Sequence, residues 1–207
     1  VIFNEVRREA PAILCTWWLG SEAGNAICNV LWGDYNPSGK LPMTFPQHNG
    51  QIPLYYQYKS TGRPTTLGGW CAKYIDIPTE PAYPFGYGLS YTTFNYSDVK
   101  LLPGDGKGTY TRVAVTVTNT GKCEGEEVVQ LYVRDEVASI TRPIKELKGF
   151  EKIKLNPGES KTVTFDVKDE QLGFYNNQMK FIVEKGDFTL MVGGNSRDLQ
   201  EIKYILN

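Results

Sequence analysis

Apolar and polar residues alternate along the second half of the chain, from about Thr93 to Asn207. Successive side chains of a β-strand point to opposite faces of its sheet, so each alternating run predicts a strand with one apolar face. The alternation is weak where Phe94, Tyr96 and Asp98 would share a face. It is clear in the runs at residues 113–118, 129–134, 163–167 and 188–192. Strands of this kind, separated by turn residues, predict two antiparallel sheets packed face to face.

Two segments of this half depart from the alternation. Residues 169–175 break it, and we expect a short helical turn there. Residues 145–152 form a run of mixed charge, from Lys145-Glu146 to Glu151-Lys152. Such charges are typical of a solvated strand face or of a protected sheet edge, so we expect no binding patch in this run.

Residues 1–46 have a different pattern, which reads as strand, turn and helix. A nearly continuous apolar run at residues 12–18 predicts a strand buried on both faces, and residues 41–45 predict another short strand. Between them, apolar residues recur at helical spacing from Ala23 to Leu31, with Ser21 as the expected N-cap and Gly33 as the C-cap. One helix and one buried strand cannot close a layered core, so this piece is predicted to be incomplete α/β structure.

Residues 47–92 lack a regular pattern and are rich in Pro, Gly and aromatic residues. A long irregular segment is usually functional or connects two domains. Its aromatic content does not suit a flexible, solvated linker, so we expect a connector packed against a partner domain. The predicted fold class of the whole chain is therefore mainly β.

Composition excludes several classes of protein. Of the 207 residues, 22% are charged and 41% hydrophobic, which is ordinary globular composition and argues against disorder. The net charge is −1 without a basic cluster, so no nucleic-acid partner is expected. No apolar stretch reaches the length of about 20 residues that a membrane span needs. The first residues lack both the pattern of a signal peptide and a Met, so we expect the chain to begin within a longer protein.

Candidate reactive residues are few. His48 lies in the connector without a nearby nucleophile motif, and a surface-loop histidine is the favoured interpretation. Glu22 follows Gly20-Ser21 at the start of the predicted helix, where a carboxylate commonly compensates the helix dipole. The glycines around it do not match a phosphate-binding loop. The sequence therefore assigns no catalytic, cofactor-binding or metal-binding residue, and we expect no cofactor.

The four cysteines form no CxxC pair, which disfavours zinc or thioredoxin-type chemistry. We expect free thiols, most of them serving as packing groups. They are Cys15, Cys28, Cys71 and Cys123.

Three strings of residues resemble signatures of glycoside hydrolase family 3. They are Asn36-Pro37-Ser38-Gly39-Lys40 within residues 30–42, Phe85-Gly86-Tyr87-Gly88-Leu89-Ser90-Tyr91 within residues 83–94, and Thr141-Arg142-Pro143-Ile144-Lys145-Glu146-Leu147 within residues 141–150. Their order and spacing also fit, and the resemblance covers essentially the whole chain. The chain looks like the C-terminal portion of a β-glucosidase or β-xylosidase of that family.

The resemblance implies an architecture. Members have a (β/α)₈-type barrel, an α/β sandwich domain and often a fibronectin type III-like domain. In these terms residues 1–46 resemble the end of the α/β sandwich domain and residues 47–92 the connector. Residues 93–207 resemble the fibronectin type III-like β-sandwich.

The resemblance also implies an activity for the parent protein. It would be a periplasmic or secreted, retaining, exo-acting β-glycosidase, with an oligosaccharide or aryl β-glycoside substrate bound through the barrel. A barrel Asp would form the glycosyl-enzyme and a Glu would act as acid/base, and both lie outside the matched strings. Glu22 matches a family position, but not that of the acid/base. The chain itself is expected to be inactive and to brace the catalytic domains.

The connector aromatics leave two interpretations open. They would either line outer substrate subsites or pack between domains, and packing is favoured because large aromatics dominate interfaces. These residues are Tyr55, Tyr56, Tyr58 and Trp70.

Two alternatives to the bracing role follow from the sandwich alone. An independent polysaccharide-binding or partner-binding module would need exposed aromatics, for which Tyr132, outward by the alternation, and Tyr110 are the candidates. The other alternative is a domain that mediates dimerisation. The sequence makes no prediction of the oligomeric state.

Overall fold

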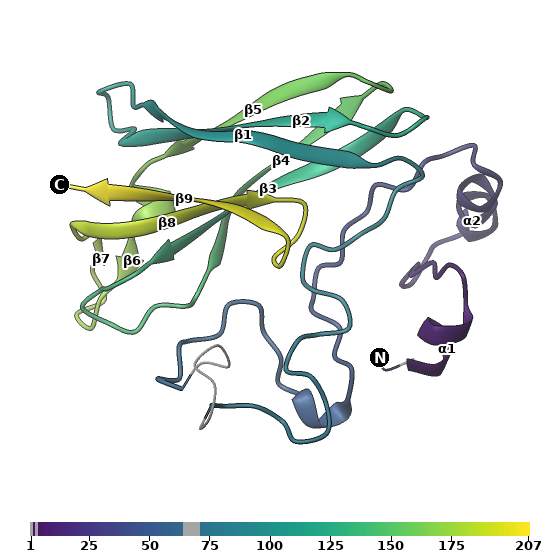
Figure 1. Ribbon diagram of the computed structural model, residues 1–207, viewed down its shortest axis with the longest axis horizontal. Helices are drawn as coiled ribbons and strands as arrows, with labels where there is room; N and C mark the ends of the chain where they lie inside the picture. The colour runs from purple at the N-terminus through teal and green to yellow at the C-terminus, as the bar shows by residue number, and fades with distance from the viewer. Residues whose placement is uncertain (1, 3, 64–70) are drawn as a thin grey trace.

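The computed structural model describes residues 2, 4–63 and 71–207 (Figure 1). Its helical elements are α1 (Asn4–Glu9), α2 (Ala23–Trp32), the 3₁₀ helix η1 (Asn49–Gln51) and α3 (Asp169–Leu172). Its strands are β1 (Phe94–Pro103), β2 (Thr111–Asn119), β3 (Gly125–Asp135), β4 (Glu146–Leu155), β5 (Ser160–Val167), β6 (Phe174–Tyr175), β7 (Phe181–Ile182), β8 (Gly186–Gly193) and β9 (Leu199–Leu206).

The predicted β-sandwich is confirmed. One sheet has the strand order β1-β2-β5 and the other β4-β3-β8-β9, and every pairing is antiparallel. The apolar faces of the two sheets form one core, in which Val115, Leu131 and Leu190 are fully buried. Burying such side chains contributes about 1.5–3 kcal/mol each. Figure 1 shows the two layers, with the short β6–β7 hairpin below them.

A β-bulge in β1 explains the weak alternation at its start. Asp98 has a positive φ of 55°, and the register with β2 shifts between Ser97 and Lys100. The bulge moves the inward face from Tyr96 to Val99, which packs against the core with Leu101. Asp98 is exposed, so the prediction that it shares a face with Tyr96 is wrong.

The charged run lies in β4, which is an edge strand of the four-stranded sheet, so the prediction of edge protection is confirmed. The short helical turn predicted within residues 169–175 is confirmed as α3, but Phe174–Tyr175 form the strand β6. The strand β9 was not predicted, because Gln200, Glu201 and Lys203 interrupt its apolar pattern.

The first part of the chain corrects several predictions. Helix α2 and its Gly33 C-cap at φ 83° are confirmed, but Glu22 occupies the N-cap position instead of Ser21. Helix α1 was not predicted. Residues 12–18 form no strand, and Trp18 is 94% exposed. Among the described residues no strand lies beside this run, so its backbone has nothing to pair with.

The strand predicted at residues 41–45 is reduced to one bridge, between Phe45 and Tyr83. Helix α2 has no buried residue, and its Leu31 and Trp32 are exposed. Figure 1 shows α1 and α2 standing outside the two sheets. This part of the chain therefore exposes apolar surface.

The connector is irregular, as predicted, with η1 inside it. It runs below the four-stranded sheet in Figure 1 and is bonded to that sheet at several points. No helix in the described part of the chain is long and apolar enough to cross a membrane.

Candidate functional site

The outer face of the four-stranded sheet is covered by the connector. Tyr132 on β3 points away from the sandwich core, yet it is fully buried. The ring of Tyr56 meets it edge-on at 5.8 Å and also stacks on Phe85 at 4.3 Å between ring centroids. Residues 36–40, which precede the connector, contact the sandwich as well. We use the term junction for the contact that these residues and the connector together make with the sandwich. Tyr132, a candidate for an exposed sugar-binding aromatic in the alternative interpretation, points outward as predicted but is not exposed, because the connector covers it.

Gln130 is the polar centre of the junction. Its amide Nε2 donates to the carbonyl of Gly194 at 2.6 Å and to that of Gly86 at 3.3 Å. Its Oε1 accepts from the hydroxyl of Tyr132 at 2.6 Å. Gly86 has a φ of +79°, and a Cβ there would lie 2.2 Å from the Gln130 Oε1. Only glycine therefore allows the connector to approach so closely.

An ion pair joins residue 40 to the start of β3. The Nζ of Lys40 lies 3.0 Å from Oε2 of Glu127 and also donates to the carbonyl of Gly88 at 3.1 Å. The hydroxyl of Tyr96 donates to Oε1 of Glu127 at 2.9 Å. Burial, and secondarily the nearby Glu127, raise the pKa of Tyr96, so its hydroxyl stays protonated and remains a donor. Both side chains of the pair are largely buried, which makes the loss of either partner costly.

Asn36 connects three segments that are distant in the sequence. Its Oδ1 accepts from the backbone N–H of Tyr91 and from the Ser90 hydroxyl, both at 2.8 Å. Its Nδ2 donates to the carbonyl of Glu124 at 2.8 Å. The Tyr91 hydroxyl in turn donates to the carbonyl of Val30 in α2 at 2.6 Å. Asn36 therefore adds a second link between the start of the chain and the sandwich, beside the Lys40–Glu127 pair.

Residues 141–150 close the junction from the other side. The N–H of Leu147 donates to the Tyr56 hydroxyl at 3.3 Å, and the N–H of Ile144 donates to the carbonyl of Tyr58 at 2.9 Å. Lys145 donates to the carbonyl of Ser196 at 2.8 Å, and its burial lowers its pKa. All three strings that resemble the family signatures therefore meet at the junction.

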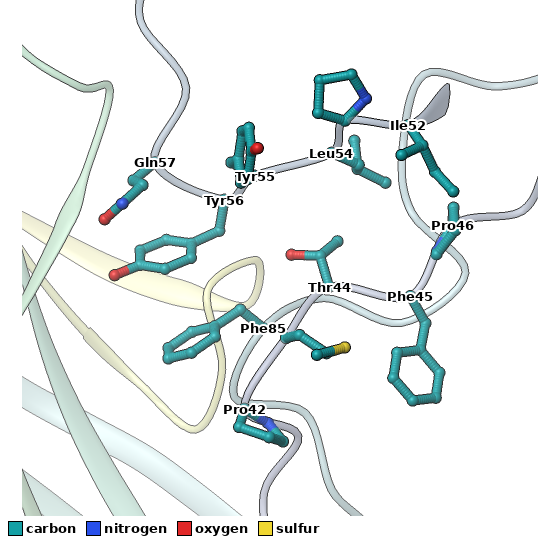
Figure 2. Close-up of a pocket in the computed structure, with 12 residues that line it drawn as sticks. Pro42, Thr44, Phe45, Pro46, Ile52, Leu54, Tyr55, Tyr56, Gln57 and Phe85 are labelled. Carbon is teal, nitrogen blue, oxygen red and sulfur yellow. The ribbon is translucent and has the colours of Figure 1, made fainter. Parts of the chain in front are cut away.

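Beside the junction, residues 42–46 and the connector form an apolar groove of about 400 Å³. Figure 2 shows residues 42–46 and 52–57 facing one another across it, with Phe85 at one end. Met43, Ile52 and Tyr55 are exposed there. The lining residues include no carboxylate, thiol or imidazole, so the groove suits packing more than chemistry.

The connector aromatics are divided between these places. Tyr56 packs between connector and sandwich, Tyr55 lines the groove, and Tyr58 is exposed beside residues 143–144. Trp70 lies outside the described residues. The choice between an outer subsite and interdomain packing stays a prediction for Tyr55 and Tyr58.

The remaining sequence candidates have local roles. His48 is exposed, as predicted, and its Nδ1 accepts from the N–H of Gly50 at 3.0 Å as the cap of η1. Glu22 is exposed and accepts from the Asn25 amide at 2.6 Å. Tyr110 is partly exposed and donates to Asp169. The described residues contain no cluster of His, Cys, Asp and Glu arranged to hold a metal ion.

The cysteines are free thiols, as predicted. Cys15 and Cys28 are exposed, so the prediction that most of the four cysteines serve as packing groups is wrong. Cys28 lies in α2, which has no buried residue, and Cys15 lies in the run of residues 12–18 ahead of it.

Sequence reasoning missed the polar residues of the junction, which are Asn36, Lys40, Glu127 and Gln130. A signal was present for Asn36 and Lys40, since both lie in the first family string and periodicity explains the role of neither. Periodicity placed Gln130 on the outer face of β3, but it did not show which segment covers that face.

Comparison with known families accounts for both sides of the junction. A model of the glycosyl hydrolase family 3 C-terminal domain matches residues 1–91, and a model of the fibronectin type III-like domain matches residues 127–196. The chain belongs to glycosyl hydrolase family 3. Lys40 and Gly86 lie in the first matched segment of this family 3 chain, and Glu127 and Gln130 lie in the second. The junction therefore joins the two family domains.

Relatives of known activity resemble this family 3 chain closely. The periplasmic beta-glucosidase of Salmonella typhimurium is 52% identical over 201 residues, which cover 94% of this chain and 26% of the relative. A beta-xylosidase of Formosa agariphila is 47% identical over 198 residues, with the same two coverages. The crystal structure of a beta-glucosidase from Listeria innocua in complex with glucose superposes with a TM-score of 0.90 at 43% identity, over 98% of this chain and 29% of that chain. The chain thus spans about a quarter of the length of the curated relatives it matches.

Proposed function

We propose that this chain is the non-catalytic C-terminal portion of a retaining, exo-acting β-glycosidase of β-glucosidase type, which hydrolyses terminal β-linked sugars. The observation that carries the proposal is the match of this chain to two family domains. The chain is also 52% identical to a beta-glucosidase, of which it covers 26%. The nucleophile and the acid/base would then belong to domains outside the matched segment.

The role proposed for the chain is to brace those domains. The junction joins residues 36–40, the connector and the sandwich through buried hydrogen bonds and one buried ion pair. A rigid sandwich fastened in this way would hold the apolar faces of α2 and of the groove in a fixed position for packing. In this proposal residues 1–46, 47–92 and 93–207 are the α/β piece, the connector and the brace.

The substrate would be an oligosaccharide or an aryl β-glycoside bound mainly by the barrel domain. A periplasmic or secreted location agrees with the name of the Salmonella typhimurium relative. The alternative of an independent sugar-binding module loses its main candidate, because Tyr132 is buried under the connector.

The first test is an activity assay of the purified chain of 207 residues on an aryl β-glucoside. We expect no turnover above the buffer, since the proposed catalytic groups lie elsewhere. Turnover that co-purifies with the folded chain would contradict the proposal.

The second test is a chimera in which this chain replaces the equivalent segment of the Salmonella typhimurium beta-glucosidase. We expect an active enzyme whose KM is close to that of the parent, because this segment braces the site without forming it. Lys40→Met in the chimera should shorten the lifetime of activity on heating, whereas the exposed-pair variant Lys154→Met should not. A chimera that folds but hydrolyses nothing would contradict the bracing role.

A further inference from the structure

The loop between β3 and β4, residues 136–145, lines an open cavity of about 340 Å³ beside the connector. Residues 134–144 line the cavity, and Ser60 of the connector completes its wall. The N–H of Ile144 donates to the carbonyl of Tyr58 at 2.9 Å, and the backbones of Lys59 and Pro143 form an isolated antiparallel β-bridge. We call this contact between the loop and residues 58–60 the loop seam.

Two buried polar atoms beside the cavity have no hydrogen-bond partner among the described residues. They are Oδ2 of Asp135 and Nε of Arg142. Asp135 is 9% exposed, and the side chain of Arg142 is also 9% exposed. A buried polar atom without a partner loses its hydrogen bonds to water and gains none from the protein. Each of these two atoms therefore destabilises the closed arrangement of the loop.

The charges facing Asp135 leave its ionised form poorly compensated. Arg142 of the loop attracts it, whereas Glu184, before β8, and Glu136, at the end of β3, repel it. The guanidinium of Arg142 is also engaged elsewhere, in an ion pair with Glu146 and 4.5 Å above the ring of Phe174. One N–H, that of Val137, points to the Asp135 carboxylate.

We propose that the loop seam is a proton-linked latch, in which protonated Asp135 holds residues 136–144 closed against the connector and ionised Asp135 loosens them. The neutral acid tolerates burial better than the carboxylate and needs no counter-charge. The latch would set how firmly residues 58–60 are fastened to the sandwich. It is independent of the proposed glycosidase function.

The direction of the pH dependence follows from the carboxyl group. Burial raises the pKa of Asp135 above its ordinary value of 3.8, with Arg142 acting in the opposite sense. A carboxyl group whose pKa is raised in the closed state adds stability as the pH falls through that raised pKa. The gain is complete below 3.8, where the open form is protonated as well. The latch should therefore close at mildly acidic pH and loosen toward neutral pH.

The test is hydrogen–deuterium exchange of the whole chain between about pH 4 and pH 8, read on peptides that cover residues 136–144. After correction for the intrinsic exchange rate, protection should fall as the pH rises. Each unit by which the pKa is raised corresponds to a tenfold loss of protection. Asp135→Asn introduces a neutral side chain of the same size. At every pH, this variant should show the protection that the wild type shows only at acidic pH. The matched control Asp166→Asn, at a half-exposed pair with Lys168, should retain the wild-type profile.

Three results would overturn the latch. The first is wild-type protection of residues 136–144 that does not change across this pH range. The second is Asp135→Asn with the same pH dependence as the wild type. The third needs no variant: a carbon-13 titration of the wild-type chain in which the Asp135 carboxyl has an ordinary or lowered pKa.

Discussion

Replacing Gly86 by Ala tests whether the junction depends on a backbone contact that only glycine permits. Gly86 has a φ of +79°, and the new methyl would lie 2.2 Å from Oε1 and 3.0 Å from Cδ of Gln130. Gln130 is buried and cannot move aside without breaking its bonds to Gly194 and to the Tyr132 hydroxyl. The substitution therefore combines an unfavourable backbone conformation with the displacement of a buried amide.

The two contributions can be given separate magnitudes. A side chain at a left-handed φ costs about 1–2 kcal/mol. Leaving a buried hydrogen-bonding group without its partner costs a further ~1–3 kcal/mol. We expect Gly86→Ala to lower the free energy of unfolding by about 3 kcal/mol in total, which is roughly 6–12 °C in melting temperature for a chain of this length.

The measurement is thermal unfolding followed by circular dichroism in the far ultraviolet, where the sheets dominate the signal. Gly158→Ala is the matched control, since Gly158 has a φ of +77° in the sandwich and nothing within 4 Å of the new methyl. It should show the backbone cost alone, about 1–2 kcal/mol. A double variant, Gly86→Ala with Gln130→Ala, removes the collision and should cost less than the sum of the two single variants.

Equal losses for Gly86→Ala and Gly158→Ala would refute the reasoning, because they would show that the contact with Gln130 contributes nothing. Strict additivity in the double variant would do the same. Either result would mean that the connector lies on the sheet without a close contact between Gly86 and Gln130.

Further outcomes follow from the same contacts. Lys40→Met should destabilise the chain by about 3–5 kcal/mol in urea unfolding, because it leaves Glu127 buried without its cation, whereas Lys154→Met at an exposed pair should cost about 1 kcal/mol or less. A loss below about 1 kcal/mol for Lys40→Met would argue that water replaces the lysine. The exposed apolar side chains around Trp18, Leu31 and Trp32 should bind an apolar fluorescent dye, and limited proteolysis should cut ahead of Phe94 while the sandwich survives. A first part of the chain as well protected as the sandwich would contradict that expectation.

Periodicity predicted the elements whose character is local. The core residues Val113, Leu131 and Leu190 were placed correctly because each strand needs only its own alternation to define an inward face. Helix α2 was found from its apolar spacing and from Gly33 at its end. The strand predicted at residues 12–18 failed because a strand also requires a bonded neighbour, which an apolar run does not reveal.

The candidate site was predictable only in part. The three family strings contain Asn36, Lys40, Gly86 and the second half of the β3–β4 loop, residues 141–145, so the sequence pointed to the right segments. Their roles were not predictable, because each role depends on a partner far away in the sequence, as with Lys40 and Glu127. The expectation that this chain contains no catalytic residue stays a prediction until the chain is assayed.

The sequence by itself determined that residues 93–207 form a two-sheet sandwich and that the chain resembles family 3, since local alternation and contiguous strings are properties of neighbouring residues. Only the tertiary structure decided what covers the outer face of that sandwich. Alternation places Gln130 and Tyr132 opposite the core, but it does not distinguish solvent from another segment of the chain. The connector, held by Gly86 and stacked through Tyr56, buries that face, because carbonyls of its irregular backbone, at Tyr58, Phe85 and Gly86, accept hydrogen bonds from the sandwich.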